Sequence, residues 1–153
     1  MGGRGGGSGG GGGGSIESDL AKANEIDSKL QDPYIDNKDK PKRDSELIDK
    51  IINNYDKAIN LKPNSPAHKD NVDGLIANDI SQRLQNNFPN KSGSQTRLYK
   101  DKRVNLASKT YDVKDKLKEN GFKFNPQGAT WGKSYKDKSF SEIRNDLKNI
   151  GLI

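Results

Sequence analysis

Residues 121–135 read GFKFNPQGATWGKSY, and this stretch decides the fold of the C-terminal third of the chain. Phe122 and Phe124 alternate with polar residues, which is the two-residue period of a β-strand. The sequence Pro-Gln-Gly at 126–128 has the chemistry of a tight turn, since proline restricts the backbone and glycine relaxes it. Residues 130–135 then read as a return strand, so the sequence predicts a β-hairpin.

The residues around this hairpin extend it into a small module over 103–153. Residues 104–107 predict a short strand, and residues 111–120 predict a helix that Gly121 closes in the left-handed conformation. Ser139 and Glu142 have the spacing of a capping box, which starts a final helix. The order strand–helix–strand–strand–helix predicts a three-stranded sheet with helices on one face. Its expected core consists of Leu106, Val113, Leu117, one face of the strand with Phe122 and Phe124, Trp131, Phe140, Ile143 and Leu147.

The N-terminal half, residues 16–89, has the apolar period of helices. Ser15 is the expected N-cap of a helix over 16–30. Residues 44–61 carry the strongest apolar stripe, and either Asp44 or Ser45 is the expected cap of that helix. Ser65-Pro66 restarts a helix that continues to Pro89, so the last two helices form a hairpin. Residues 55–63 resemble the second helix of a tetratricopeptide repeat, but only half a repeat is present, and an ordinary helix is favoured. The predicted fold class is α+β: a helical hairpin region followed by a small βαββα-like module.

Residues 1–15 hold 11 of the 17 glycines and are predicted to be a disordered tail. Three origins fit this composition: a natural flexible tail, which we favour, an artificial linker, or a minimal Arg-Gly-Gly tail that binds nucleic acid. Arg4 is the only charged residue there, which weakens the third interpretation. Residues 90–102 are polar and predict a linker, so the chain is predicted to divide into 1–15, 16–89, 90–102 and 103–153.

The chain has no cysteine, which excludes disulfides and thiolate metal sites. It has one histidine, His68, and a single histidine argues against most zinc and haem sites. It has no Asp-x-Asp pair, Glu-x-x-His pair or phosphate-binding glycine loop. We therefore expect no enzymatic activity, no catalytic residue, no metal and no cofactor. Because it has neither an apolar run long enough for a membrane span nor a signal peptide, we expect no membrane contact. The expected location is intracellular: the cytoplasm or, for a viral protein, the virion or host-cell interior.

Positive charge is concentrated after residue 90. Residues 91–153 contain 15 Lys and Arg against 7 Asp and Glu, a net charge of +8, whereas residues 1–90 contain 12 against 14. A basic module with interleaved aromatic rings favours a nucleic-acid partner, single-stranded in particular, because cations contact phosphates and rings stack on bases. Phosphate contacts give affinity with little sequence choice. A solvated lysine-rich surface is the alternative. The expected contacts are Arg97, Arg103, Lys114, Lys118, Lys123, Lys133, Tyr135, Lys136 and Lys138.

The same module resembles a known family. Val104-Asn105-Leu106, Lys114, Leu117-Lys118, the run GFKFN at 121–125 and Trp131-Gly-Lys at 131–133 are similar to a small domain of unknown function. That domain is appended to plasmid- and phage-borne DNA-processing proteins, including primases and topoisomerases. In the resemblance, Phe124-Asn125 takes the place of a Trp-Asp pair and Trp131 that of the second-strand tryptophan. Glu-Asn-Gly at 119–121 replaces Leu-Gly, and Gly132 replaces an aromatic residue. The resemblance implies association with nucleic-acid enzymes and supplies no catalytic residues.

A second hypothesis is a protein-interaction role, as a structural or assembly component of a virus or mobile element. Two helices cannot hide both of their apolar stripes completely, so a larger partner or self-association would cover the hairpin. Alternatively, another part of the chain covers it. The two hypotheses differ in salt dependence, because nucleic-acid binding weakens steeply with salt whereas apolar docking persists. The expected docking residues are Leu47, Ile51, Tyr55, Ile76 and Ile80.

Overall fold

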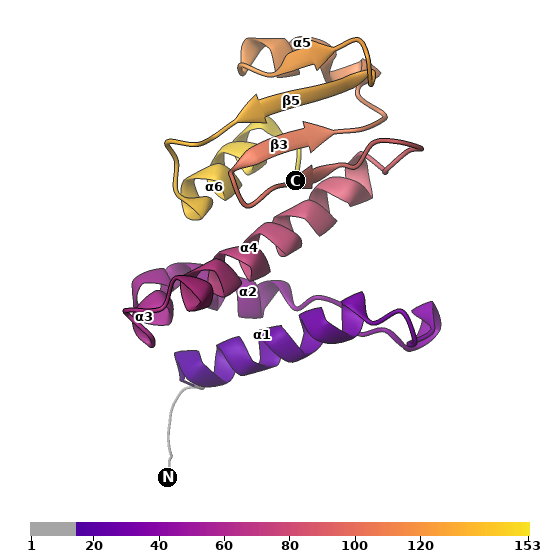
Figure 1. The fold of residues 1–153 in the computed structure, drawn as a ribbon. Helices are drawn as coiled ribbons and strands as arrows, with labels where there is room; N and C mark the ends of the chain where they lie inside the picture. The colour runs from indigo at the N-terminus through magenta and orange to yellow at the C-terminus, as the bar shows by residue number, and fades with distance from the viewer. Residues whose placement is uncertain (1–14) are drawn as a thin grey trace. The chain divides into compact units, whose positions relative to one another are not determined.

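A computed structural model describes residues 15–153, and the predicted α+β class is confirmed (Figure 1). The chain divides into two compact units, residues up to Leu75 and residues 76–153. The division falls inside the longest helix, α4 (Pro66–Asn87), and each unit is described by itself. The predicted glycine-rich tail lies, except for Ser15, outside the described residues.

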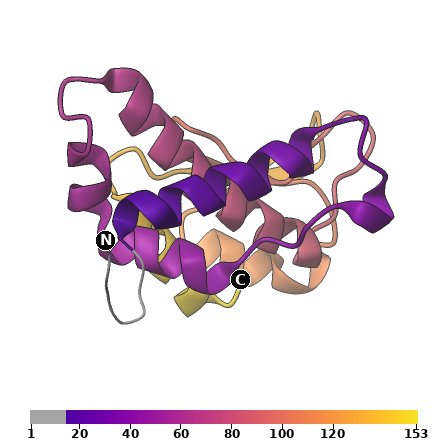
Figure 2. The same ribbon diagram turned by 90° about the horizontal axis from the view of Figure 1, so that it is seen from below.

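The first unit is helical: α1 (Ile16–Gln31), the short η1 (Asn37–Asp39), α2 (Ser45–Asn53), α3 (Tyr55–Asn60) and the first half of α4. Its helices begin where the sequence predicts, because side chains accept hydrogen bonds from the first turn. Ser15 Oγ accepts from the Ser18 amide at 3.2 Å, and Asp44 Oδ1 accepts from the Leu47 amide at 3.1 Å. α1 packs along α2 (Figure 2).

The prediction of one continuous helix over 44–61 is wrong, because the helix is interrupted at Asn54, between α2 and α3. Asn54 has φ −118° and ψ 30°, outside the helical region. Its side-chain amide donates to the Lys50 carbonyl at 2.9 Å. Asparagine side chains compete with the backbone for such hydrogen bonds, which explains the interruption within an otherwise apolar-periodic stretch.

The second unit contains the rest of α4, four strands and two further helices. The strands are β2 (Arg97–Leu98), β3 (Arg103–Leu106), β4 (Lys123–Asn125) and β5 (Thr130–Ser134). Between β3 and β4 lie η2 (Tyr111–Val113) and α5 (Lys114–Glu119), and α6 (Phe140–Ile150) follows β5. The predicted βαββα order is confirmed. The expected strand number is wrong, because β2 lies in the segment predicted as a linker and the sheet has order β2-β3-β5-β4, all antiparallel.

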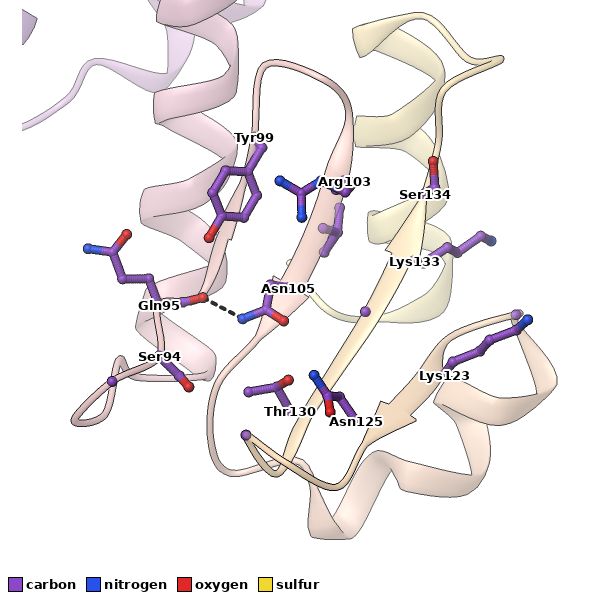
Figure 3. Close-up of a pocket in the computed structure, with 15 residues that line it drawn as sticks. Ser94, Gln95, Tyr99, Arg103, Asn105, Lys123, Asn125, Thr130, Lys133 and Ser134 are labelled. Atoms are coloured by element: carbon purple, nitrogen blue, oxygen red, sulfur yellow. Dashed lines mark hydrogen bonds between the residues drawn. The ribbon is translucent and has the colours of Figure 1, made fainter.

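One face of this sheet is buried, and α6 lies behind it in Figures 1 and 3. The Ser139–Glu142 capping box is confirmed, and Gly121 and Gly151 close α5 and α6 with φ of +86° and +90°. Phe124 departs from the expected core: it is 49% exposed, because β4 is an edge strand. The buried residues of the unit include Ile80, Leu84, Phe88, Leu98, Val104, Leu106, Leu117, Phe122, Trp131, Phe140, Ile143, Leu147 and Leu152, while Val113 is half-buried.

The outer edge of β2 is closed by side chains. Ser81 Oγ, on α4, accepts from the Leu98 amide at 2.8 Å and donates to the Leu98 carbonyl at 3.3 Å. Two residues earlier, Asn90 Oδ1 accepts from the Thr96 amide at 2.8 Å, and Gln85 Nε2 donates to the Thr96 carbonyl at 2.9 Å. These four hydrogen bonds replace a neighbouring strand, so two strand residues suffice to form a stable edge.

Candidate nucleic-acid interface

The opposite face of the sheet is polar, and we call it the outer face. Because directly paired residues on neighbouring strands point to the same side, the register identifies its members. One row crosses all four strands: Arg97 pairs with Asn105, Asn105 with Gly132, and Gly132 with Lys123. We call these four residues the cross-sheet row. The outer face also contains Tyr99, Arg103, Asn125, Thr130 and Ser134.

An open groove of about 740 Å³ runs over this face (Figure 3). Its floor includes Gly132, at the centre of β5. A Cβ atom there would lie 3.3 Å from the Val104 carbonyl oxygen and 3.9 Å from Asn105 Oδ1. Glycine inside a strand commonly marks a place where another group approaches the backbone closely. The missing side chain therefore makes a notch between Asn105 and Lys123.

Tyr99 anchors one end of the groove. Its ring lies against two guanidinium groups, with the Arg97 Cζ at 4.5 Å and the Arg103 Cζ at 4.6 Å from the ring centroid. Arg103 Nε also donates to Asp101 Oδ2 at 2.8 Å, and this hydrogen bond lowers the pKa of the Asp101 carboxyl. The cluster holds planar, charged groups in a fixed arrangement, although Asp101 offsets part of the positive charge.

Two amide side chains present defined hydrogen-bonding atoms to the groove. Asn105 Nδ2 donates to the Gln95 carbonyl at 2.7 Å, which leaves Oδ1 as an acceptor on the side of Gly132 (Figure 3). Asn125 Oδ1 accepts from the Gln127 amide at 3.1 Å, which leaves its NH₂ group as a donor. The groove thus has a fixed acceptor on β3 and a donor on β4.

Lys133 was expected to contact nucleic acid together with Lys123; both line the groove, but the register places them on opposite faces of the sheet. Lys123 pairs with Gly132, so Lys133, one position later, belongs to the buried face. Its Nζ donates to the Asn120 carbonyl at 2.7 Å and lies 3.7 Å from Asp146 Oδ2. The Lys133 ammonium group is therefore engaged by Asn120 and Asp146 of the protein itself.

Tyr135 was expected to stack on bases, and this prediction is wrong. The residue is buried, at 4% exposure, and its ring packs edge-to-face against Phe122. Its hydroxyl donates to Asp146 Oδ2. Burial and this hydrogen bond raise the pKa of the Tyr135 phenol. Trp131, also among the lysines in sequence, belongs to the core because it pairs with Leu106.

The remaining expected cations lie outside the outer face. Lys114 and Lys118 lie on α5, and the Lys114 Nζ lies 4.3 Å from the ring centroid of Tyr111, which is 76% exposed. Lys136 and Lys138 are exposed between β5 and α6. The structure thus brings together Arg97, Arg103 and Lys123, and it adds Tyr99, Asn105, Asn125 and Gly132, which the sequence interpretation missed. The alternation of Arg97, Leu98 and Tyr99 was a signal for β2, but it lies in the segment interpreted as a linker.

The expected docking stripe of the helical hairpin is buried. Leu47 and Ile51 on α2, and Ile76 and Ile80 on α4, are all buried, so they offer no free apolar face. Tyr55 is half-buried, and its hydroxyl donates to Asp73 Oδ1 at 2.5 Å. The pKa of the Tyr55 phenol is raised by its burial and by this carboxylate.

No family model, curated protein or solved structure shows significant similarity to the chain. Within residues 15–153, no three His, Asp or Glu side chains are grouped so that they could hold a metal ion. The helices described between Ser15 and Ile153 include none that is long and apolar enough to cross a membrane.

Proposed function

We propose that this protein is a non-catalytic accessory that binds nucleic acid through the outer face of its four-stranded sheet. The observation that carries the proposal is the cross-sheet row, which places Arg97 and Lys123 on opposite edge strands with Asn105 and Gly132 between them. With Arg103 beside this row, cations lie at both ends of one groove. A nucleic-acid strand that lies along the groove would therefore place its phosphates next to positive charge at both ends of the groove.

Contacts of this kind are directed at the phosphate backbone. Arg103 and Lys123 are exposed, and residues 91–153 as a whole carry a net charge of +8. Long-range attraction between this charge and phosphates raises the association rate, and the direct contacts set orientation without sequence choice. The resemblance of residues 104–133 to a domain appended to DNA-processing proteins supports the same class of partner.

A solvated sheet face is the competing explanation, because antiparallel sheets commonly leave one face to water. Two features distinguish this face from a merely solvated one. Gly132 leaves the centre of the longest strand without a side chain, at a place where a Cβ atom would crowd the Val104 carbonyl at 3.3 Å and where no positive φ requires glycine. The Arg97 and Arg103 guanidinium groups are also held against one ring, Tyr99, where exposed arginines would otherwise be mobile.

The proposal is tested by fluorescence anisotropy of a labelled single-stranded oligonucleotide with the full chain at about 50 and 200 mM salt. Three phosphate contacts predict a loss of affinity of roughly 20-fold between these salts. The variant Arg103→Glu with Lys123→Glu should bind at least tenfold more weakly than the wild type at low salt. Its matched control is Lys22→Glu with Lys57→Glu, two exposed lysines of the helical unit. Equal losses in both variants, or binding that resists salt, would contradict the proposal.

A further inference from the structure

We propose that the groove over Gly132 takes one unpaired nucleobase, so that the ligand is single-stranded nucleic acid held through a base as well as through phosphates. This inference rests on the proposed function and specifies the substrate class of the same site. It follows from the shape of the groove, from its fixed polar atoms and from the groups at its ends.

The shape of the groove suits a flat group. Along β5, the outer-face neighbours of Gly132 are Thr130 and Ser134, which are small, and across the sheet they are Asn105 and Lys123. The absent side chain exposes backbone at the centre, so a planar ring can lie on the strand between taller side chains. The groove volume of about 740 Å³ lies within the roughly 300–1,000 Å³ of small-molecule sites, so it has room for one base.

The polar atoms around the notch match the edge of a base. Asn105 Oδ1 is an acceptor whose orientation is fixed by the hydrogen bond from Nδ2 to Gln95. The NH₂ group of Asn125 is a donor, because the Asn125 Oδ1 atom is used by Gln127. The Watson–Crick edge of an unpaired base presents both a donor and an acceptor, so one base can satisfy both amides.

The ends of the groove match what flanks a base in a strand. Arg103, held by Tyr99 and Asp101, is a planar cation beside the notch, and such groups stack on bases and bind phosphate. Lys123 supplies an ammonium group at the other end. In a duplex the bases are stacked and paired between two backbones. A duplex would therefore bring only its phosphates to Arg103 and Lys123, and no base would enter the notch. The combination therefore favours a single strand.

The experiment compares two ligands of equal charge with the full chain. One is a ten-nucleotide single strand, and the other is the same length with abasic sites in place of every base. At about 100 mM salt we expect the normal strand to bind about tenfold more tightly, since stacking of one base on the planar Arg103 guanidinium contributes that order of affinity. Equal affinities would overturn this inference and leave the proposed function standing. If neither ligand binds, both proposals fail.

Variants then locate the base. Gly132→Val fills the notch and should lower the affinity of the normal strand to that of the abasic strand, with abasic binding unchanged. Because a Cβ atom here lies 3.3 Å from the Val104 carbonyl, this variant can fail to fold. Asn125→Ser is the second variant: serine keeps an acceptor for the turn, but its hydroxyl is one bond shorter than the amide and does not reach the position of the NH₂ donor, so it should reduce the preference for bases by about threefold to tenfold. Asn145→Ser, on the exposed side of α6, is the control. A folded Asn125→Ser protein with an undiminished preference would overturn the placement over Gly132.

Discussion

The two faces of the four-stranded sheet come from the same short strands and differ residue by residue. On β3, Val104 and Leu106 point to the helices, while Arg103 and Asn105 point to the outer face. The buried side has a continuous apolar core that includes Leu98, whereas the outer side has amides, cations and a glycine. Burial of apolar area stabilises the fold, so the inner residues are constrained by packing. The outer residues are less constrained by apolar packing, and the proposed function rests on their pattern of amides, cations and a glycine.

The largest expected effect tests whether stability comes from the inner face alone. Leu106→Ala removes a fully buried side chain and should lower the free energy of unfolding by about 2–5 kcal/mol. Lys123→Ala, on the exposed edge strand, should change it by less than about 0.5 kcal/mol. Urea unfolding followed by circular dichroism measures both. Comparable losses for the two variants would remove the distinction between the faces.

The next largest effect on the free energy of unfolding is expected at Tyr135. This buried residue looks like a surface residue in the sequence because it lies between Ser134 and Lys136. Tyr135→Phe removes the hydrogen bond to Asp146 and should cost about 1 kcal/mol near neutral pH. Because burial raises the folded pKa of this phenol above its ordinary value of 10.0, its stabilisation is complete below pH 10 and is lost as the pH rises further. Unfolding free energies measured from pH 8 to pH 11 should fall more steeply for the wild type than for Tyr135→Phe. Parallel curves would show that Tyr135 titrates normally in the folded state.

A smaller effect is expected on the salt dependence of binding, and it distinguishes Lys123 on the outer face from Lys133 on the inner face. Lys123→Ala should reduce the slope of log affinity against log salt by about 0.7–1, the contribution of one phosphate contact. Lys133→Ala should leave that slope unchanged, because Lys133 Nζ is engaged by Asn120 and Asp146. Anisotropy at four salt concentrations measures both slopes. The reverse order of effects would mean that the binding surface lies on the side of Lys133.

The smallest expected effect is the acid response of α6, the helix behind the inner face. Hydrogen bonds from Ser139, the backbone amide first, lower the pKa of the Glu142 carboxyl below its ordinary value of 4.5. The unfolded chain therefore binds a proton more readily, so the stabilisation is present above pH 4.5 and is lost as the pH falls through the folded pKa. Between pH 5 and pH 3 the wild type should lose stability slightly faster than Glu142→Gln. Identical acid profiles would argue that the capping box is not formed in solution.

Local features of this fold could be predicted from the sequence. Ser15, Asp44 and Ser139 cap helices, and Gly121 and Gly151 end them, because capping depends on residues within one turn. The β-hairpin over 123–134 was predictable for the same reason, since its turn and its alternation are both local.

Features that depend on distant partners could not be predicted. β2 has two residues, and its edge is completed by side chains of α4 that precede it by 11 to 17 positions. The alternation around Phe124 identifies its face but not that its strand lies at the edge of the sheet, so its exposure was missed. The candidate site shares this limit: Arg97, Asn105, Gly132 and Lys123 form one row only through a register that joins four separate segments.

The closed edge of β2 has a consequence for self-association. The amide and carbonyl groups of Thr96 and Leu98 that face away from the sheet already have partners in Ser81, Gln85 and Asn90. Edge-to-edge polymerisation requires each molecule to offer two free edges, one to receive a strand and one to pass the pairing on. Among residues 15–153, the β4 side is the edge of this sheet that is left for such pairing, so edge-to-edge pairing through this sheet would join no more than two molecules. The hydrogen bonds that complete a two-residue strand therefore also block this edge against the addition of a strand from another molecule.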